Sequence, residues 1–198
     1  MARTPTQSDW NRFARGVRRR ARKLVEKYAA ETITADEFGV QFRDLLADRH
    51  GRAGYLGRRR GGDDWEFDED DALFGEIIAE DEQEFLDQFV LDLSLGRYRN
   101  GKGEPDIEAI DRRAQMYVRK LRGTSNEAFA GTADTEDEIE WLMSASEHCQ
   151  SCRDLAAGSP YKPDELPTYP GSGGTSCLTS CRCRLKRVSD KREGFRAE

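Results

Sequence analysis

Long apolar runs are missing from this 198-residue sequence, and their absence sets the first limits on its class. No stretch approaches the roughly 20 apolar residues that a membrane-spanning helix needs, so we expect no membrane span. The first ten residues, MARTPTQSDW, also lack the apolar stretch of a secretory signal. Hydrophobic residues make up 36% of the chain and charged residues 35%, so the core must be thin and is expected to be mostly helical.

The sequence has only two histidines and five cysteines, and their positions are informative. The five cysteines all lie between Cys149 and Cys183, whereas a secreted disulfide scaffold normally spreads an even number along its chain. The two histidines, His50 and His148, stand beside no recognisable nucleophile motif. No acid–base pair is nominated by its spacing, so the sequence predicts neither an enzyme nor a small-molecule substrate.

Charge of the two signs is segregated along the chain, whose formal net charge is −6. Residues 1–60 carry 15 basic and 7 acidic groups, residues 61–110 carry 3 and 17, and residues 111–198 carry 14 of each. The basic head can therefore fold against the acidic middle, or each can face a different partner. Two solvated helix faces are the alternative interpretation.

The hydrophobic periodicity of the first third predicts two helices. Apolar residues at the three-to-four spacing of one helix face predict a helix over residues 9–30, with Ser8 as its N-cap. Thr34 and Glu37 stand at capping-box spacing before a second apolar pattern. They predict a second, shorter helix over residues 35–49.

The acidic middle predicts a loop followed by one long helix. Residues 50–64 contain five glycines and four arginines, which predicts a loop with a basic patch at Arg58, Arg59 and Arg60. A long helix is then expected over residues 69–94. The stripe expected to be buried in it is Leu73, Phe74, Ile77, Ile78, Phe85, Leu86, Phe89, Val90 and Leu93.

The chain after this helix changes character. A loop is expected over residues 95–105, then a helix over 107–122 that Asp106 caps, and a short helical turn at 125–130. Alternating apolar residues from Ile139 onward predict a strand that leads into the cysteines.

The segment between the cysteine groups cannot be helix interior or central strand. Residues 158–176 hold four prolines and four glycines, so an irregular loop is expected, and its low apolar content requires an anchor. The predicted fold class is mainly α, α+β overall. Its parts are a helical, charge-segregated region 1–130, a cysteine-rich α+β module 131–190 and a tail 191–198.

The cysteines are spaced as in a metal site. Cys149-x2-Cys152 is followed, after 24 residues, by Cys177-x3-Cys181-x-Cys183. Two cysteines separated by two residues, as Cys149 and Cys152 are, can place both thiolates of one tight turn on one ion, with Zn–S near ~2.3 Å. Cys181 and Cys183 would face the same side of a strand. We expect a structural zinc ion that joins both ends of the proline-rich loop and uses four of the five cysteines.

Other interpretations of this cluster stay open at this point. Spacing does not decide whether Cys177, Cys181 or Cys183 is the spare cysteine, and His148 is an alternative ligand. Disulfides between the two groups and unligated thiols are the rival interpretations. A catalytic zinc is disfavoured, because catalytic sites keep a position for water whereas four thiolates close the site.

Two basic segments can contact double-stranded DNA through its phosphates without reading sequence. The first lies on one face of the first helix, with Arg18, Arg19 and Arg22. The second follows the last cysteine, with Lys186 and Arg187. Neither segment has the interleaved aromatic residues of a single-strand platform. Solvated surface is the alternative interpretation of both segments.

The C-terminal third resembles a known family signature. It is carried by Trp141, His148-Cys149-x-x-Cys152, Gly158-Ser-Pro-Tyr161, Asp164-Glu-Leu-Pro167, Pro170-Gly171, Cys177 and Cys181-Arg182-Cys183-Arg184-Leu185. This run resembles the C-terminal signature of tailed-phage head morphogenesis proteins, the minor capsid proteins similar to the F protein of phage Mu. The resemblance covers about residues 110–188. Many relatives carry a histidine shortly before the Cys-Arg-Cys, near the place where this chain has Cys177.

The resemblance implies a non-enzymatic virion protein. Such a minor head component would associate with the portal, the major capsid protein or both, and with packaged DNA. It would lie in the capsid interior or portal region of the virion, and in the host cytoplasm during assembly. Cys177 would take the ligand role of the relatives' histidine. The alternatives are a zinc-stabilised DNA-binding adaptor or regulatory protein, and a toxin-like or nuclease enzyme of the kind sometimes fused to this family.

Overall fold

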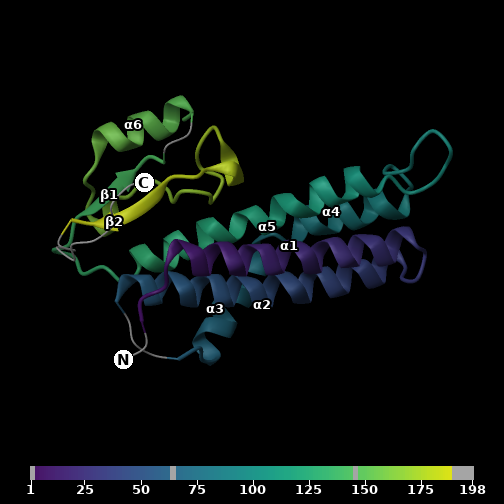
Figure 1. The fold of residues 1–198 in the computed structure, drawn as a ribbon, viewed down its shortest axis with the longest axis horizontal. Helices are drawn as coiled ribbons and strands as arrows, with labels where there is room; N and C mark the ends of the chain where they lie inside the picture. The colour runs from purple at the N-terminus through teal and green to yellow at the C-terminus, as the bar shows by residue number, and fades with distance from the viewer. Residues whose placement is uncertain (1–2, 63–65, 145–146, 189–198) are drawn as a thin grey trace.

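The computed structural model describes residues 3–62, 66–144 and 147–188 (Figure 1). Within these residues there are six α-helices and one two-stranded sheet. Five helices build an elongated body, and the sixth lies with the sheet in a small C-terminal region that contains the cysteines. This arrangement confirms the predicted fold class. The expected tail 191–198 lies outside the described residues.

Three long helices run side by side along the body: α1 (Gln7–Ala29), α2 (Ala35–Gly61) and α5 (Ile107–Ala130) (Figure 1). A capping box opens each of the first two. The box of α2, Thr34 with Glu37, is the predicted one. The box of α1 is formed by Thr6 with Asp9, so the prediction of Ser8 as N-cap is wrong. Thr6 caps because the Asp9 carboxylate, three residues on, accepts from the Thr6 backbone N–H at 2.9 Å.

The predicted loop over 50–64 is wrong as far as Gly61, because α2 continues through this segment as helix. Gly51, Gly54 and Gly57 recur every three residues and lie where neighbouring helices come closest. A Cβ on Gly51 would stand 2.6 Å from the Asp71 carbonyl oxygen, and one on Gly54 would stand 2.7 Å from the Phe74 ring. Close packing of α2 on its neighbours therefore outweighs the low helix propensity of glycine.

The three arginines of the expected basic loop patch accordingly lie in the last turn of a helix. Arg58 pairs with the buried Asp71 at 2.6 Å, and Arg59 is 6% exposed. Arg60 donates to the side-chain oxygen of Asn126 at 2.9 Å. These cations are therefore packed against the fold, and they do not form an exposed patch on a loop.

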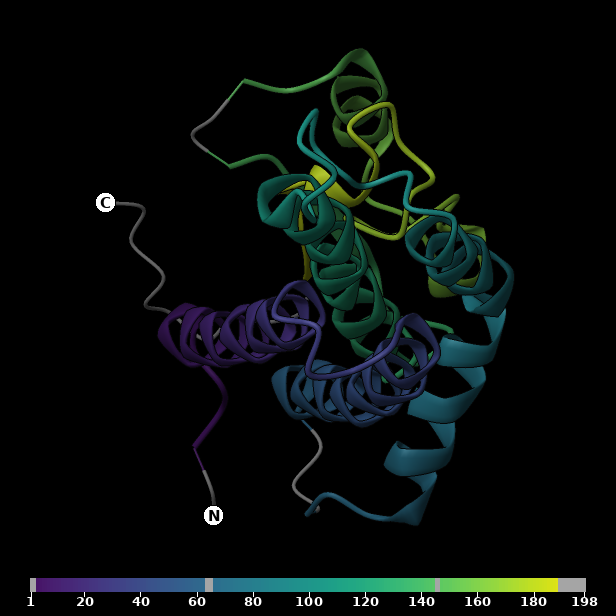
Figure 2. The ribbon, with the colours of Figure 1, turned by 90° about the vertical axis from the view of Figure 1, so that its right-hand side faces the viewer.

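The single helix predicted over 69–94 is divided at Glu82 into α3 (Glu69–Asp81) and α4 (Gln83–Ser94). Figure 2 shows both on the side of α2 that faces away from α1. The part of the expected stripe on α4 is buried at Leu86, Phe89 and Leu93, but Phe85 is 62% exposed. On α3 the buried residues are Asp71, Gly75 and Ala79, while Leu73 and Ile77 face outward. Small residues form the contact face because α3 packs directly on the glycines of α2.

A buried polar cluster explains why the helix breaks at Glu82. The Glu82 carboxylate is 3% exposed and lies 2.8 Å from the Lys120 Nζ and 3.6 Å from the His50 Nε2. The other ring nitrogen of His50, Nδ1, lies 2.7 Å from the Thr124 hydroxyl. Burial raises the pKa of Glu82, and burial together with the Lys120 charge lowers the pKa of His50 to about 3. The break turns the carboxylate toward its buried partners.

Replacing His50 with glutamine is expected to flatten the pH dependence of stability. The pKa of His50 falls from 6.5 to about 3 on folding, so below pH 6.5 the unfolded chain binds this proton more readily. Stability is therefore lost as the pH falls through this window, by at most about 1.4 kcal/mol per pH unit. Urea unfolding at about pH 7.5 and about pH 5 measures the difference between the wild type and His50→Gln. Equal slopes for both proteins would contradict the assignment.

Helix α5 begins as predicted, with Asp106 accepting from the Ala109 backbone N–H at 2.9 Å. It does not end at 122, and the turn expected at 125–130 is its continuation to Ala130. Buried polar residues in this last part, from Thr124 to Asn126, contact α2 and the proline-rich loop. Among the described residues no helix combines the length and apolar content of a bilayer span.

The C-terminal region is built on an antiparallel pair of strands, β1 (Ile139–Leu142) and β2 (Arg184–Arg187), with Trp141 opposite Leu185. The strand expected from Ile139 is confirmed. Tyr161 continues the ladder on the other edge of β1 through two backbone hydrogen bonds with Ile139. Helix α6 (Gln150–Gly158) packs beside β1, and most of residues 158–176 is irregular, as predicted.

Candidate metal centre

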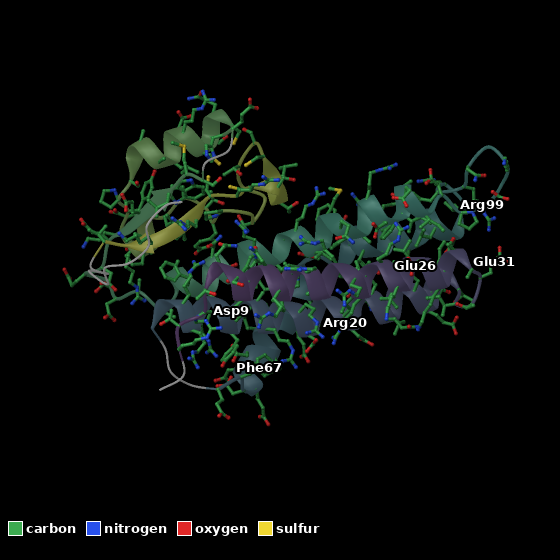
Figure 3. All side chains as sticks on the ribbon, viewed as in Figure 1. Asp9, Arg20, Glu26, Glu31, Phe67 and Arg99 are labelled. Atoms are coloured by element: carbon green, nitrogen blue, oxygen red, sulfur yellow. The ribbon has the colours of Figure 1, made fainter. Side chains whose placement is uncertain are left out.

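All five cysteines come together in the C-terminal region, from two stretches of chain, 149–152 and 177–183. Cys149 is the N-cap of α6, and Cys152 lies in its first turn. Cys177 and Cys181 flank the short 3-10 helix Leu178–Ser180, and Cys183 immediately precedes β2. Figure 3 shows the sulfur atoms gathered between α6 and the segment that precedes β2. The two ends of the proline-rich loop therefore meet at one place.

The sulfur atoms form two overlapping groups of three, each of which could hold a metal ion. The Cys152 Sγ lies 3.6 Å from the Cys177 Sγ and 3.5 Å from the Cys181 Sγ. Four sulfurs around a zinc ion with ~2.3 Å bonds would stand about 3.8 Å apart. Two groups of three sulfurs have all members within 4.8 Å of one another, and Cys152 belongs to both: Cys149, Cys152 and Cys177, and Cys152, Cys181 and Cys183. The cluster can therefore hold a metal ion such as zinc.

Burial and local charge distinguish the five thiols. Cys152, Cys181 and Cys183 are buried, and the other two are half-buried. Burial opposes ionisation of Cys149, but hydrogen bonds from Cys152 and Cys177 outweigh it and lower its pKa to about 7. Burial and the neighbouring sulfurs raise the pKa of Cys152. The neighbouring thiols therefore shift one another's pKa in both directions, and a bound cation would favour the thiolate form of each ligand.

Hydroxyl groups tie the two arms of the cluster to each other. The Ser151 Oγ, next to Cys152, lies 2.6 Å from the Ser176 Oγ, next to Cys177. The buried Thr175 hydroxyl lies 3.3 Å from the Cys177 Sγ. The cysteine arms are therefore held in place by a surrounding set of hydrogen bonds, as ligands of metal sites commonly are.

The five cysteines form no disulfide with one another. All five are free, and the sulfur separations of 3.5 and 3.6 Å are well beyond a disulfide bond of about 2.05 Å. His148 reaches the edge of the cluster, with its Nδ1 3.5 Å from the Cys183 Sγ and its Nε2 2.7 Å from the Ser144 carbonyl oxygen. Its contact is with Cys183 and not with the central Cys152.

The residues expected to contact DNA fall into two groups, exposed cations and cations that lie beside carboxylates. Arg18 and Arg19 are exposed on α1, and Lys186 is exposed on β2. Arg22 is engaged by three carboxylates, and Arg187 lies 3.6 Å from Asp137. The partners of Arg22 are Glu26, Glu108 and Asp111, at 2.9–3.3 Å. Figure 3 shows the neighbouring Arg20 on the body, away from the sulfur atoms.

One residue that joins the body to the proline-rich loop was missed by sequence reasoning. Asn126 is 2% exposed, donates to the Pro170 carbonyl oxygen at 2.7 Å and accepts from Arg60. A Cβ on Gly123, one turn earlier, would lie 2.5 Å from the Ser172 Cα, so the loop rests directly on α5. The polar run Thr124-Ser125-Asn126 within an otherwise apolar stripe was the available signal.

The comparisons with known proteins assign no family to this arrangement. No protein-family model, curated protein or solved structure matches this chain significantly.

Proposed function

We propose that this chain is a non-enzymatic structural protein of a tailed-phage head, a minor capsid component that acts during head morphogenesis by contacting the portal, the inner capsid or both. The observation that supports this proposal is that residues of the sequence run resembling the family signature lie close together in the structure. Trp141 and Leu185, near the two ends of the resembling run, stand opposite each other in the sheet, and every cysteine of the run enters one cluster. A signature whose separate parts build one site is better support than a linear pattern.

The metal of this module is proposed to be zinc in a structural role. Its ligands in this proposal are Cys149, Cys152, Cys177 and Cys181, because Cys152 contacts Cys177 and Cys181 and forms a tight group with Cys149. Cys183, which lies against His148, is then the spare cysteine. Four thiolates leave no position for water, so the ion would stabilise the fold and do no chemistry on a substrate.

The helical body supports a role in protein contacts. The outward face of α1 is basic, whereas α3 and α4, on the other side of α2, combine acidic residues with the exposed apolar residues Leu73, Ile77 and Phe85. Two faces of opposite character suit a component held between different neighbours in a large assembly. A contact with packaged DNA would use the exposed Arg18 and Arg19, since Arg22 is engaged by carboxylates.

Co-sedimentation with the partners tests this proposal. We expect the purified full-length chain to co-sediment with the portal or procapsid of its own phage at moderate ionic strength. Replacing both Leu73 and Phe85 with serine is expected to weaken the association at least about tenfold, because each removes exposed apolar area from the α3–α4 face. The exposed Val40→Ser is the matched control on α2. Failure of the wild type to co-sediment with either particle would refute the proposal.

The alternative function is a zinc-stabilised DNA-binding adaptor, and the exposed arginines of α1 favour it. The same sedimentation experiment separates the two functions when duplex DNA replaces the particles. Binding to DNA with a steep salt dependence, together with no binding to portal or procapsid, would favour the adaptor.

A further inference from the structure

A cavity of about 530 Å³ lies between the helical body and the sheet. The elements that line it meet at the end of the body where the C-terminal region lies, as the ribbon in Figure 1 shows. Its walls come from the start of α1, the end of α2, the second half of α5 and the strand β2. This volume is within the range of small-ligand pockets in proteins. The proposed assembly role makes no use of it.

The charge of the lining is one-sided. Five cationic side chains line the cavity, and none of its lining residues is acidic. These cations are Arg60, Arg122, Arg184, Lys186 and Arg187. Arg187 has a carboxylate neighbour in Asp137, 3.6 Å away. Among the described residues, no carboxylate lies within ion-pair distance of Arg60 or Arg122.

The two arginines without carboxylates are held in fixed orientations. The Arg60 guanidinium lies 4.2 Å from the centre of the Phe129 ring and donates to Asn126. The Arg122 guanidinium lies 5.8 Å from the centre of the Trp10 ring and donates to the Arg182 carbonyl oxygen. Each of these contacts leaves other N–H groups of the guanidinium available for a ligand. The buried Arg60 Nε has no hydrogen-bond partner.

This crowding of cations is unfavourable when the cavity holds water alone. Burial lowers the pKa of Arg60 to about 10, and the charges of Arg122 and Arg184 add to the effect. A multiply charged anion would relieve this repulsion and complete the unused donors. A single carboxylate carries one charge, whereas a phosphate monoester carries about −1.5 to −2 and three acceptor oxygens.

We propose that this cavity binds the phosphate group of a nucleotide. The cavity is larger than a phosphate ion requires, and its other walls include the Trp10 ring, Leu56, Leu142 and the polar Ser125. These walls suit a sugar and a flat base attached to the phosphate. The nucleotide would be either free in solution or the phosphorylated 5′ end of a DNA strand, because both present the same group. The inference stands apart from the proposed role in head assembly.

Calorimetric titration of the full-length protein tests the inference and separates the two sources. The probes are dAMP, a short thymidine oligonucleotide with a 5′ phosphate, and the same oligonucleotide with a 5′ hydroxyl. Binding of dAMP supports the free-nucleotide source. Binding of the phosphorylated strand in preference to the hydroxyl strand, without binding of dAMP, supports the strand end.

Charge-removing variants locate the binding. Arg60→Gln is expected to weaken binding about tenfold or more, since it removes a charged donor from the wall of the cavity. Lys186→Gln, at the exposed rim, is expected to weaken it several-fold and tests the inference should Arg60→Gln misfold. Arg19→Gln removes a charge from the outer face of α1 and reports on contact with DNA across that surface. Lys102→Gln, in the exposed turn after Leu95 and outside the cavity lining, is expected to leave affinity unchanged.

Three results would overturn the inference. The first is no binding of dAMP or of either oligonucleotide. The second is equal binding of the two oligonucleotides, with affinity reduced equally by Arg19→Gln and Lys186→Gln. This result would indicate nonspecific contact of the protein surface with DNA phosphates. The third is binding of a glutamate-rich peptide in the absence of any nucleotide binding, which would assign the cavity to an acidic protein segment.

Discussion

Replacing Cys152 with serine is expected to abolish metal binding and to unfold the C-terminal region while the helical body stays folded. Cys152 is the sulfur common to both groups of three, and its Sγ lies 3.5 Å from Cys181 and 3.6 Å from Cys177. Structural zinc sites supply about 10–16 kcal/mol of apparent binding free energy at neutral pH. The loop between the cysteines has little apolar area of its own. Burial of that area therefore cannot replace the free energy of metal binding, and the loop is expected to lose its structure without the ion.

Two measurements check this result together. Elemental analysis is expected to find about one zinc per wild-type chain and none in Cys152→Ser. Amide hydrogen exchange is expected to reveal loss of protection in β1, β2 and α6, with α1, α2 and the first half of α5 unchanged. Cys183→Ser is the matched control and is expected to keep its zinc. Full protection of the two strands in metal-free Cys152→Ser would show that the region needs no ion.

The second large effect is expected from Gly75→Ala on α3. The Cβ of the alanine would meet the Ala47 carbonyl oxygen and the Gly51 backbone nitrogen well inside van der Waals contact. Both are backbone atoms of α2, so no side-chain rotation relieves the clash, and α3 must move away. We expect a loss of about 3 kcal/mol in unfolding free energy, at the upper end of overpacking effects.

The matched control for this substitution is Gly16→Ala on α1. A Cβ there meets no atom within 4 Å, so the change acts through helix propensity alone. It is expected to stabilise the protein by about 0.5–1 kcal/mol. Urea unfolding of the three proteins measures the two effects with opposite sign, and equal small changes would mean that the α2–α3 contact is loose.

The sequence was most informative where a feature depends on residues close together in the chain. The capping residues Thr34 and Asp106 mark the starts of their helices correctly, because a cap is a contact across three residues. The strand at Ile139 follows from local alternation, and the gathering of the cysteines follows from their spacing. These parts of the fold and of the candidate site required no knowledge of distant contacts.

Apart from the N-cap of α1, where the local pair Thr6 and Asp9 was missed, the errors occur where a distant contact decides the local structure. Gly51 and Gly54 are typical of a loop, yet they stay helical because α3 fills the space that their missing side chains leave. Glu82 fits an unbroken helix by pattern, but its buried contact with Lys120 requires a turn of the chain. Arg60 and Arg122 come from helices that only the fold brings to one cavity, so no sequence spacing relates them.

Helix α5 is a rigid element that sets the distance between the two ends of the molecule. Its 24 residues make a rod of about 36 Å, with the turn after Leu95 near one end and the cysteine module seated on Gly123 and Asn126 toward the other. Figure 1 shows these two regions at opposite ends of the molecule. A partner protein bound to the turn after Leu95 would therefore hold the cysteine-rich end at a fixed distance, set by the length of α5, as a rigid spacer does.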